Sequence, residues 1–408
     1  MPGLKTLALV VAVEGGARWE PKTRSGWSHL LEHLVFKGAG EMSARQIVER
    51  IEAEGGSINA ATGYERTSFE VRGLAGSLPL AMQVVSDLLF RPTLAETEIE
   101  REKDVVGQEI AEAYDTPDDH VFEMAQTRAF AGQSLGRPIL GSVASLKPAD
   151  RATVADWRAR LYSPDRMAVA VSGAVEEAEL LALAERWFGA ETATPSERPK
   201  AATFVGGAAK LGRRIEQANM VLQLPGVSAT DPDLPAMRLL TEILGGGMAS
   251  RLFQSAREDR GLAYAIDAYH EPYGDVGVLG IYAGCAADRA EELARVCADE
   301  VRALAADGPT EAELGRARTV LTAGLWMSDE SPMSRSGRLA AQTLIHGRPV
   351  SSEALATGMA GVTRNDVRRA AGRLLEGGKA ATAVLGPRAS GGAGDVFTRH
   401  LFPDGKPR

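Results

Sequence analysis

Hydrophobic and polar positions in the first half of the chain predict a sheet with helices packed on it. The apolar run at 6–13 is rich in β-branched residues and ends at a glycine pair, which favours a buried strand. A signal peptide is the weaker reading, because a strong basic start and a small-residue cleavage site are missing. The periodicity then predicts helices at 25–37 and 43–54, strands at 57–62 and 65–72, helices at 76–90 and 95–114, further helix to about 160, a strand at 166–173 and a helix at 176–188.

The second half repeats this order. It reads as a strand at 217–224, helices at 233–245 and 250–259, strands at 262–270 and 276–283, and a helix at 288–306. At a constant offset of 215, Glu98 falls on Glu313 and Pro117 on Pro332. One long period indicates a duplicated domain. We therefore predict two homologous α+β sandwich domains, at 1–194 and 208–408, joined by a polar linker at 195–207.

Composition and charge narrow the class of partner. The chain has 44% hydrophobic and 25% charged residues, as globular proteins do, and no apolar run long enough to cross a membrane. A net charge of −8 argues against nucleic acid as a partner. Two cysteines, Cys285 and Cys297, make no disulfide framework, so buried, reduced thiols and a cytoplasmic location are expected.

The pentad "HLLEH" within the helix predicted at 25–37 is the strongest chemical feature. His29 and His33 stand at i and i+4, on one helix face, so both imidazoles can reach one ion, with Glu32 beside them. Burying three such polar groups in an apolar helix without partners would cost several kcal/mol, and a bound cation removes that cost. The matching helix of the second half, "MRLLTEIL", has no histidine. The fold therefore does not need this cluster.

A catalytic zinc needs a third protein ligand. The long helix predicted at 95–114 is rich in glutamate and is the obvious donor. Its Glu102 and Glu109 are seven residues apart, two turns, so both point the same way. Either carboxylate could bind the metal while the other orients a histidine ring.

The pentad is the inverted zinc-peptidase motif H-x-x-E-H. Together with Gly26 and the following "FKG", it resembles the pitrilysin, insulin-degrading-enzyme and mitochondrial-processing-peptidase family, in its short two-domain form. The resemblance covers nearly the whole chain and implies a clamshell around a cavity, with one Zn²⁺ per chain. It implies His29, His33 and Glu109 as ligands, Glu102 as the supporting glutamate, and Glu32 as the catalytic base.

Two further segments match that family. "GGSINAATGYERTSF" is similar to an edge strand that pairs with extended substrate, and the matching residues are Asn59, Ala60, Ala61 and Thr62. "LGGGMASRLFQSAREDRGLAYAI" is similar to a segment whose arginine and tyrosine reach the substrate across the cavity, here Arg257 and Tyr264. From the residues alone, these two would be a surface arginine and a strand aromatic.

The resemblance implies a zinc metalloendopeptidase that cleaves unfolded or short peptides, as a homodimer or with a homologous subunit. The alternative is a non-catalytic or partner-dependent subunit that binds peptides. A third reading, structural zinc in a binding module, leaves Glu32 unexplained. Family members usually carry one more strand before the equivalent of 6–13, so the first sheet is expected to lack a strand.

Overall fold

Two β-sheets organise the chain, and each belongs to a separate unit. The computed structural model describes residues 1 and 3–403. The first unit comprises Met1–Glu112, Arg137–Lys200 and Trp326–Val350, and the second comprises Ala113–Gly136, Ala201–Leu325 and the described part of Ser351–Arg408. The α+β class predicted from the sequence, with helices packed on mostly antiparallel sheets, is confirmed. Enclosure of a cavity stays a prediction.

The sheet of the first unit has the order β4-β5-β1-β6, with all neighbours antiparallel. Its strands are β1 (Thr6–Glu14), β4 (Ser57–Thr62), β5 (Arg66–Leu74) and β6 (Met167–Gly173), and a short hairpin is formed by β2 (Gly38–Ala39) and β3 (Met42–Ser43). Val10 of β1 lies opposite Glu70 on one side and Ala170 on the other. The strand predicted at 6–13 is therefore confirmed, as a central strand.

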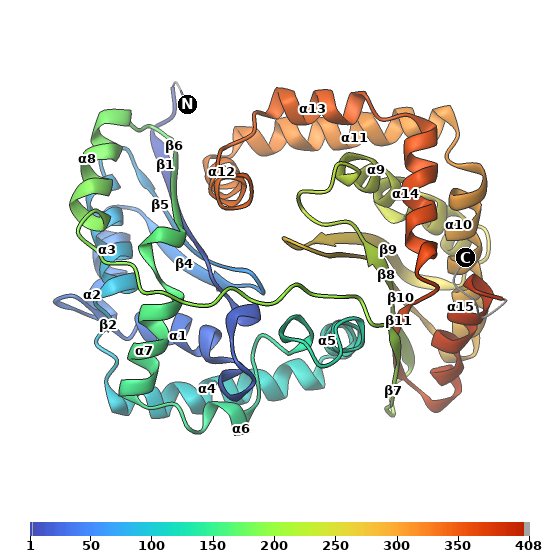
Figure 1. The fold of residues 1–408 in the computed structure, drawn as a ribbon, viewed down its shortest axis with the longest axis horizontal. Helices are drawn as coiled ribbons and strands as arrows, with labels where there is room; N and C mark the ends of the chain where they lie inside the picture. Colours follow the sequence, from blue (N-terminus) through green and yellow to red (C-terminus); the bar gives the residue numbers. More distant parts are fainter. Residues whose placement is uncertain (2, 404–408) are drawn as a thin grey trace. The chain divides into compact units, whose positions relative to one another are not determined.

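Helices cover both faces of this sheet, which explains the unbroken apolar run of β1 (Figure 1). One face packs against most of the unit's helices: α1 (Trp27–Val35), α2 (Ala44–Ala53), α3 (Leu78–Phe90), α4 (Glu96–Asp115), α6 (Val143–Leu146), α7 (Arg151–Leu161) and α8 (Glu177–Phe188). The other face packs against α12 (Pro332–His346), where Val10 and Ala12 meet Ala340. The Ser336 hydroxyl donates to the Ala8 carbonyl at 2.9 Å.

The sheet of the second unit has one strand more, in the order β7-β11-β8-β10-β9. The strands are β7 (Gly207–Gly212), β8 (Gln217–Gly226), β9 (Ala263–Pro272), β10 (Gly277–Ala286) and β11 (Ala381–Gly386). The additional strand β7 pairs in parallel with β11. In the described residues of the first unit, β6 occupies the place of β11 and pairs only with β1.

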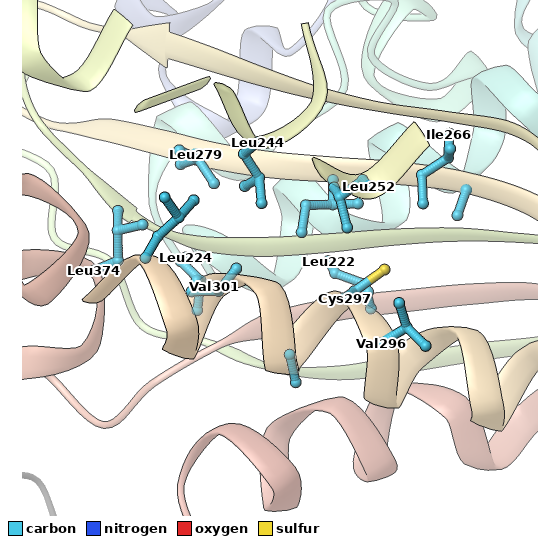
Figure 2. Packing of buried hydrophobic residues seen from close by; sticks show 14 of the residues in the cluster. Leu222, Leu224, Leu244, Leu252, Ile266, Leu279, Val296, Cys297, Val301 and Leu374 are labelled. Atoms are coloured by element: carbon cyan, nitrogen blue, oxygen red, sulfur yellow. The ribbon is translucent and has the colours of Figure 1, made fainter. Parts of the chain in front are cut away.

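The core of the second unit lies between one face of its sheet and α9 (Leu234–Gly245), α10 (Ala290–Asp307), α14 (Arg364–Glu376) and α15 (Ala393–Leu401). Figure 2 shows Cys297 of α10 packed among leucine, isoleucine and valine side chains. Cys285 and Cys297 are both free and buried, as predicted. Burial raises the pKa of Cys285 to about 11, so the thiol stays protonated at neutral pH.

Each unit also includes a helix from the other half of the sequence. α5 (Pro117–Ala129) follows α4 but packs its Val121 and Ala125 on the β8–β11 face of the second unit. α12 follows α11 (Glu311–Glu330) and belongs to the first unit, while α13 (Ser352–Ala360) returns to the second. The chain also passes between units at Lys200, inside the predicted linker. The units are thus interleaved in sequence rather than being two continuous halves.

Among the described residues, no helix combines the length and the apolar character that a membrane span requires.

His270 on β9 predicts a pH dependence of stability. Burial lowers its pKa to about 4, with Arg238 adding to the effect and Asp231 opposing it, and its Nε2 donates to the Val227 carbonyl at 3.0 Å. The imidazole of His270 binds a proton more readily in the unfolded chain than in the folded chain. The contribution of neutral His270 to the free energy of unfolding is therefore intact above pH 6.5 and is lost as the pH falls toward 4. We expect the free energy of unfolding to fall by up to about 3 kcal/mol because of this residue.

Urea unfolding at pH 5 and pH 7.5 tests this expectation. His270→Gln keeps a donor for the Val227 carbonyl but does not titrate, so its stability should change less between the two pH values. Equal pH dependence of the two proteins would contradict the assignment.

Candidate metal centre

Helix α1 carries the pentad with its apolar side inward. Leu30, Leu31 and Leu34 are fully buried in the core of the first unit, whereas His29, Glu32 and His33 are only partly buried. Gly26 is the N-cap of this helix, and its φ of 88° is left-handed. A Cβ there would lie 2.4 Å from the Leu140 carbonyl oxygen, so only glycine fits.

The two histidines and Glu109 of α4 form one cluster in the first unit. One ligand atom from each of the three side chains lies within 4.8 Å of the others. His33 Nε2 is 3.5 Å and His29 Nε2 is 3.8 Å from the Glu109 carboxylate, and the imidazole centroids are 4.7 Å apart. Two imidazole nitrogens and one carboxylate oxygen are a donor set typical of catalytic zinc.

Glu102 occupies a different position from Glu109. It is buried, accepts a hydrogen bond from His33 Nδ1 at 3.0 Å and pairs with Lys37 Nζ at 2.8 Å. Because Nδ1 carries the proton toward Glu102, the lone pair of His33 Nε2 faces Glu109 and is available to a metal. Sequence reasoning missed Lys37, although it follows His33 by four residues.

The electrostatics suit a cation. Burial, with a smaller effect of neighbouring His33, lowers the pKa of His29 to about 4, so this imidazole is neutral at physiological pH. A neutral imidazole is the form that binds metal. Burial raises the pKa of Glu32, and hydrogen bonds from Thr62 partly oppose this. Glu32 Oε2 is buried without a hydrogen-bond partner among the described residues. These residues fit a zinc ion.

Comparison with known families agrees with this geometry. Residues 2–143 match the model of the insulinase family, peptidase family M16, and residues 148–321 match the model described as the peptidase M16 inactive domain. The chain belongs to the M16 family. That the second match is to an inactive domain agrees with the absence of the pentad from the second half of this M16 chain.

Relatives of similar length carry names that refer to zinc proteases. An uncharacterized zinc protease of Rickettsia bellii is 34% identical over 388 residues, which cover 95% of this chain and 94% of that protein. The uncharacterized zinc protease Rv2782c of Mycobacterium tuberculosis is 36% identical over 396 residues, covering 96% and 90%.

Solved structures share the fold. A peptidase M16 inactive domain from Pseudomonas fluorescens superposes with a TM-score of 0.87 at 21% identity, covering 94% of each chain. A protease from Helicobacter pylori also gives 0.87, at 20% identity, covering 94% of this chain and 95% of the other.

The strand predicted to bind substrate lies at the edge of the first sheet of this M16 protein. Asn59, Ala60, Ala61 and Thr62 belong to β4, which pairs only with β5 among the described strands. Ala60 is buried in the core, while Asn59 and Ala61 are exposed. Thr62 lies beside the metal cluster, since it hydrogen-bonds Glu32 and its hydroxyl is 3.5 Å from the Ser28 carbonyl oxygen.

The predicted arginine and tyrosine belong to the second unit. Arg257 lies in a π-helical turn, Phe253–Glu258, with its guanidinium 4.7 Å from the centroid of the Phe253 ring. Tyr264 is the second residue of β9 and is 60% exposed. Their approach to the metal cluster of the first unit stays a prediction.

Proposed function

We propose that this chain is a zinc-dependent metalloendopeptidase that hydrolyses unfolded or short peptides. The observation that carries the proposal is the position of Glu32, on the same helix face as the two imidazoles that share a cluster with Glu109. A purely structural zinc needs four closed ligands and no free carboxylate. Here three side chains cluster, and a fourth side chain beside them, the carboxylate Glu32, has an oxygen without a hydrogen-bond partner among the described residues.

The roles of the residues follow from their contacts. His29, His33 and Glu109 would hold the zinc, and Glu102 with Lys37 fixes the ring of His33. A zinc ion there would polarise the scissile carbonyl and lower the pKa of water toward 7. Glu32 takes the proton of the attacking water and passes it to the leaving amine, as a general base and then a general acid.

Substrate binding by edge-strand addition is the second part of the proposal. β4 has an unpaired edge among the described strands and ends at Thr62, which hydrogen-bonds Glu32. A peptide added along Asn59–Thr62 would therefore run toward the catalytic carboxylate and be held through its backbone. Arg257 and Tyr264 would act on the substrate carbonyl, as the family resemblance implies. We also propose a homodimer, or assembly with a homologous subunit.

Metal removal and return test this function. The purified chain should contain one zinc and should cleave an unstructured, internally quenched peptide. Chelation should reduce the rate to background and added Zn²⁺ should restore it, because the zinc held by His29, His33 and Glu109 would be needed to activate the attacking water. Stoichiometric zinc with no cleavage of unstructured peptides, alone or with a homologous subunit, would overturn the enzyme proposal and favour a peptide-binding role.

A further inference from the structure

The first turn of α1 is capped by the carboxylate of Glu20, which lies in the preceding loop. Glu20 Oε2 accepts the Gly26 N–H at 2.8 Å, and Glu20 Oε1 accepts the Ser28 N–H at 2.7 Å. Glycine at the N-cap has no side chain that could accept these hydrogen bonds. Glu20 is 3% exposed, so water does not compete for its oxygens. Its negative charge also lies at the positive end of the helix dipole.

Other contacts hold Glu20 in place. The Arg137 guanidinium donates to the Glu20 carbonyl oxygen, and its charge favours the ionised carboxylate. Burial is the larger effect and raises the pKa of Glu20 to about 7. Both carboxylate oxygens act as acceptors, and the ionised form accepts these hydrogen bonds more strongly than the protonated form does. The arrangement is therefore complete on the alkaline side of that pKa.

The residues that follow Ser28 in the sequence include the two metal-binding histidines. Ser28 is followed by His29, which lies in the first turn, and Glu32 lies one turn further on. His33 has a separate support in Glu102, whereas His29 Nδ1 is buried without a hydrogen-bond partner among the described residues. The direction of the His29 ring consequently depends on the backbone of the first turn.

We propose that Glu20 is a positioning residue of the metal centre, which clamps the first turn of α1 and so sets the direction of His29 and Glu32. The inference rests on the proposed zinc-peptidase function. It goes beyond that function, because Glu20 lies outside the pentad and contacts neither metal ligands nor substrate. A helix cap with only a structural role would affect folding alone.

Glu20→Gln is the decisive variant. Its amide keeps one acceptor oxygen but turns an N–H₂ group toward a backbone donor, so one of the two hydrogen bonds is lost. At pH 8, where Glu20 of the wild type is ionised, Zn²⁺ affinity is measured by competition with a chromophoric chelator. We expect the Kd for Zn²⁺ to rise about 10- to 100-fold, the range for residues that orient ligands. In the zinc-loaded variant, kcat should fall while KM stays unchanged.

Asp366→Asn is the matched control. Asp366 accepts the Thr363 N–H at 2.8 Å at the start of α14, in the second unit, so the variant makes the same carboxylate-to-amide change at another helix N-terminus. It should lower Tm without changing the Kd for Zn²⁺ or kcat. If Glu20→Gln only lowers Tm, as the control does, the proposal is overturned.

Glu20→Asp covers the case in which Glu20→Gln does not fold. The carboxylate remains but is one methylene shorter, so an intermediate loss of Zn²⁺ affinity is expected and wild-type affinity would overturn the proposal. The outcomes separate the two proposals. A wild type that binds no zinc removes the proposed function, whereas a wild type that binds and cleaves, with unchanged Glu20 variants, removes only this inference.

Discussion

Replacing Glu32 by glutamine is expected to abolish peptide hydrolysis while leaving zinc bound. Glu32 is absent from the cluster formed by His29, His33 and Glu109, so the metal ligands stay intact. Glutamine has nearly the same shape and still accepts from Thr62, but it cannot take a proton. Loss of a general base reduces rates by about 100- to 10,000-fold. The measurement is kcat with zinc content determined on the same sample.

Glu49→Gln is the control for this prediction. Glu49 lies on α2 in the first unit, is 53% exposed and pairs with Arg45 four residues away on the same helix, so its loss should leave both zinc content and kcat unchanged. A Glu32→Gln protein that keeps more than about one tenth of wild-type kcat would exclude Glu32 as the general base.

The grouping of the site residues was only partly predictable from the sequence. Helical spacing alone places His29 and His33 on one face, and in the structure the centroids of their rings are 4.7 Å apart. Spacing could not distinguish Glu102 from Glu109, because both lie on the same side of α4. Their surroundings differ: Glu102 is buried between His33 and Lys37, whereas Glu109 lies opposite both imidazoles. The family resemblance made this choice where periodicity could not.

Glu20 could not be found by pattern reasoning. It precedes His29 by nine residues, within the polar segment "RWEPKTRSG". Charged residues in such a loop are usually solvated, and its burial arises only when the loop folds back on α1. Gly26 was one indication, because a glycine at a helix start leaves the first N–H groups without a local acceptor.

The fold was likewise predictable where local sequence determines an element, and was missed where contacts between distant segments determine it. Strand β4 was predicted with the observed bounds, at 57–62. Strand β7 was missed because "GAAKLG" lies at an exposed sheet edge and has no strong alternation. The exchange of α5 and α12 between units was missed for another reason. An amphipathic helix reveals that it has an apolar face, but not which sheet covers that face.

Replacing Glu109 by glutamine is expected to release the zinc. Its carboxylate supplies the one negative charge within the ligand cluster, between two imidazoles of which His29 is neutral at pH 7. An amide oxygen is a weaker ligand without charge. Since residues that only orient ligands cost 10- to 100-fold in affinity, loss of a direct ligand should raise the Kd for Zn²⁺ by at least about 100-fold. Hydrolysis should fall with zinc occupancy and recover in part at high Zn²⁺ concentration.

Recovery by added zinc distinguishes this variant from Glu32→Gln, which should remain inactive at every Zn²⁺ concentration. Glu100→Gln provides the control, because Glu100 lies on the same helix, is 71% exposed and pairs with Lys103. The Kd of the Glu100→Gln protein for Zn²⁺ should equal that of the wild type. If Glu109→Gln binds zinc as tightly as Glu100→Gln does, the third ligand is a different residue, and Glu102 becomes the first candidate because it already contacts His33.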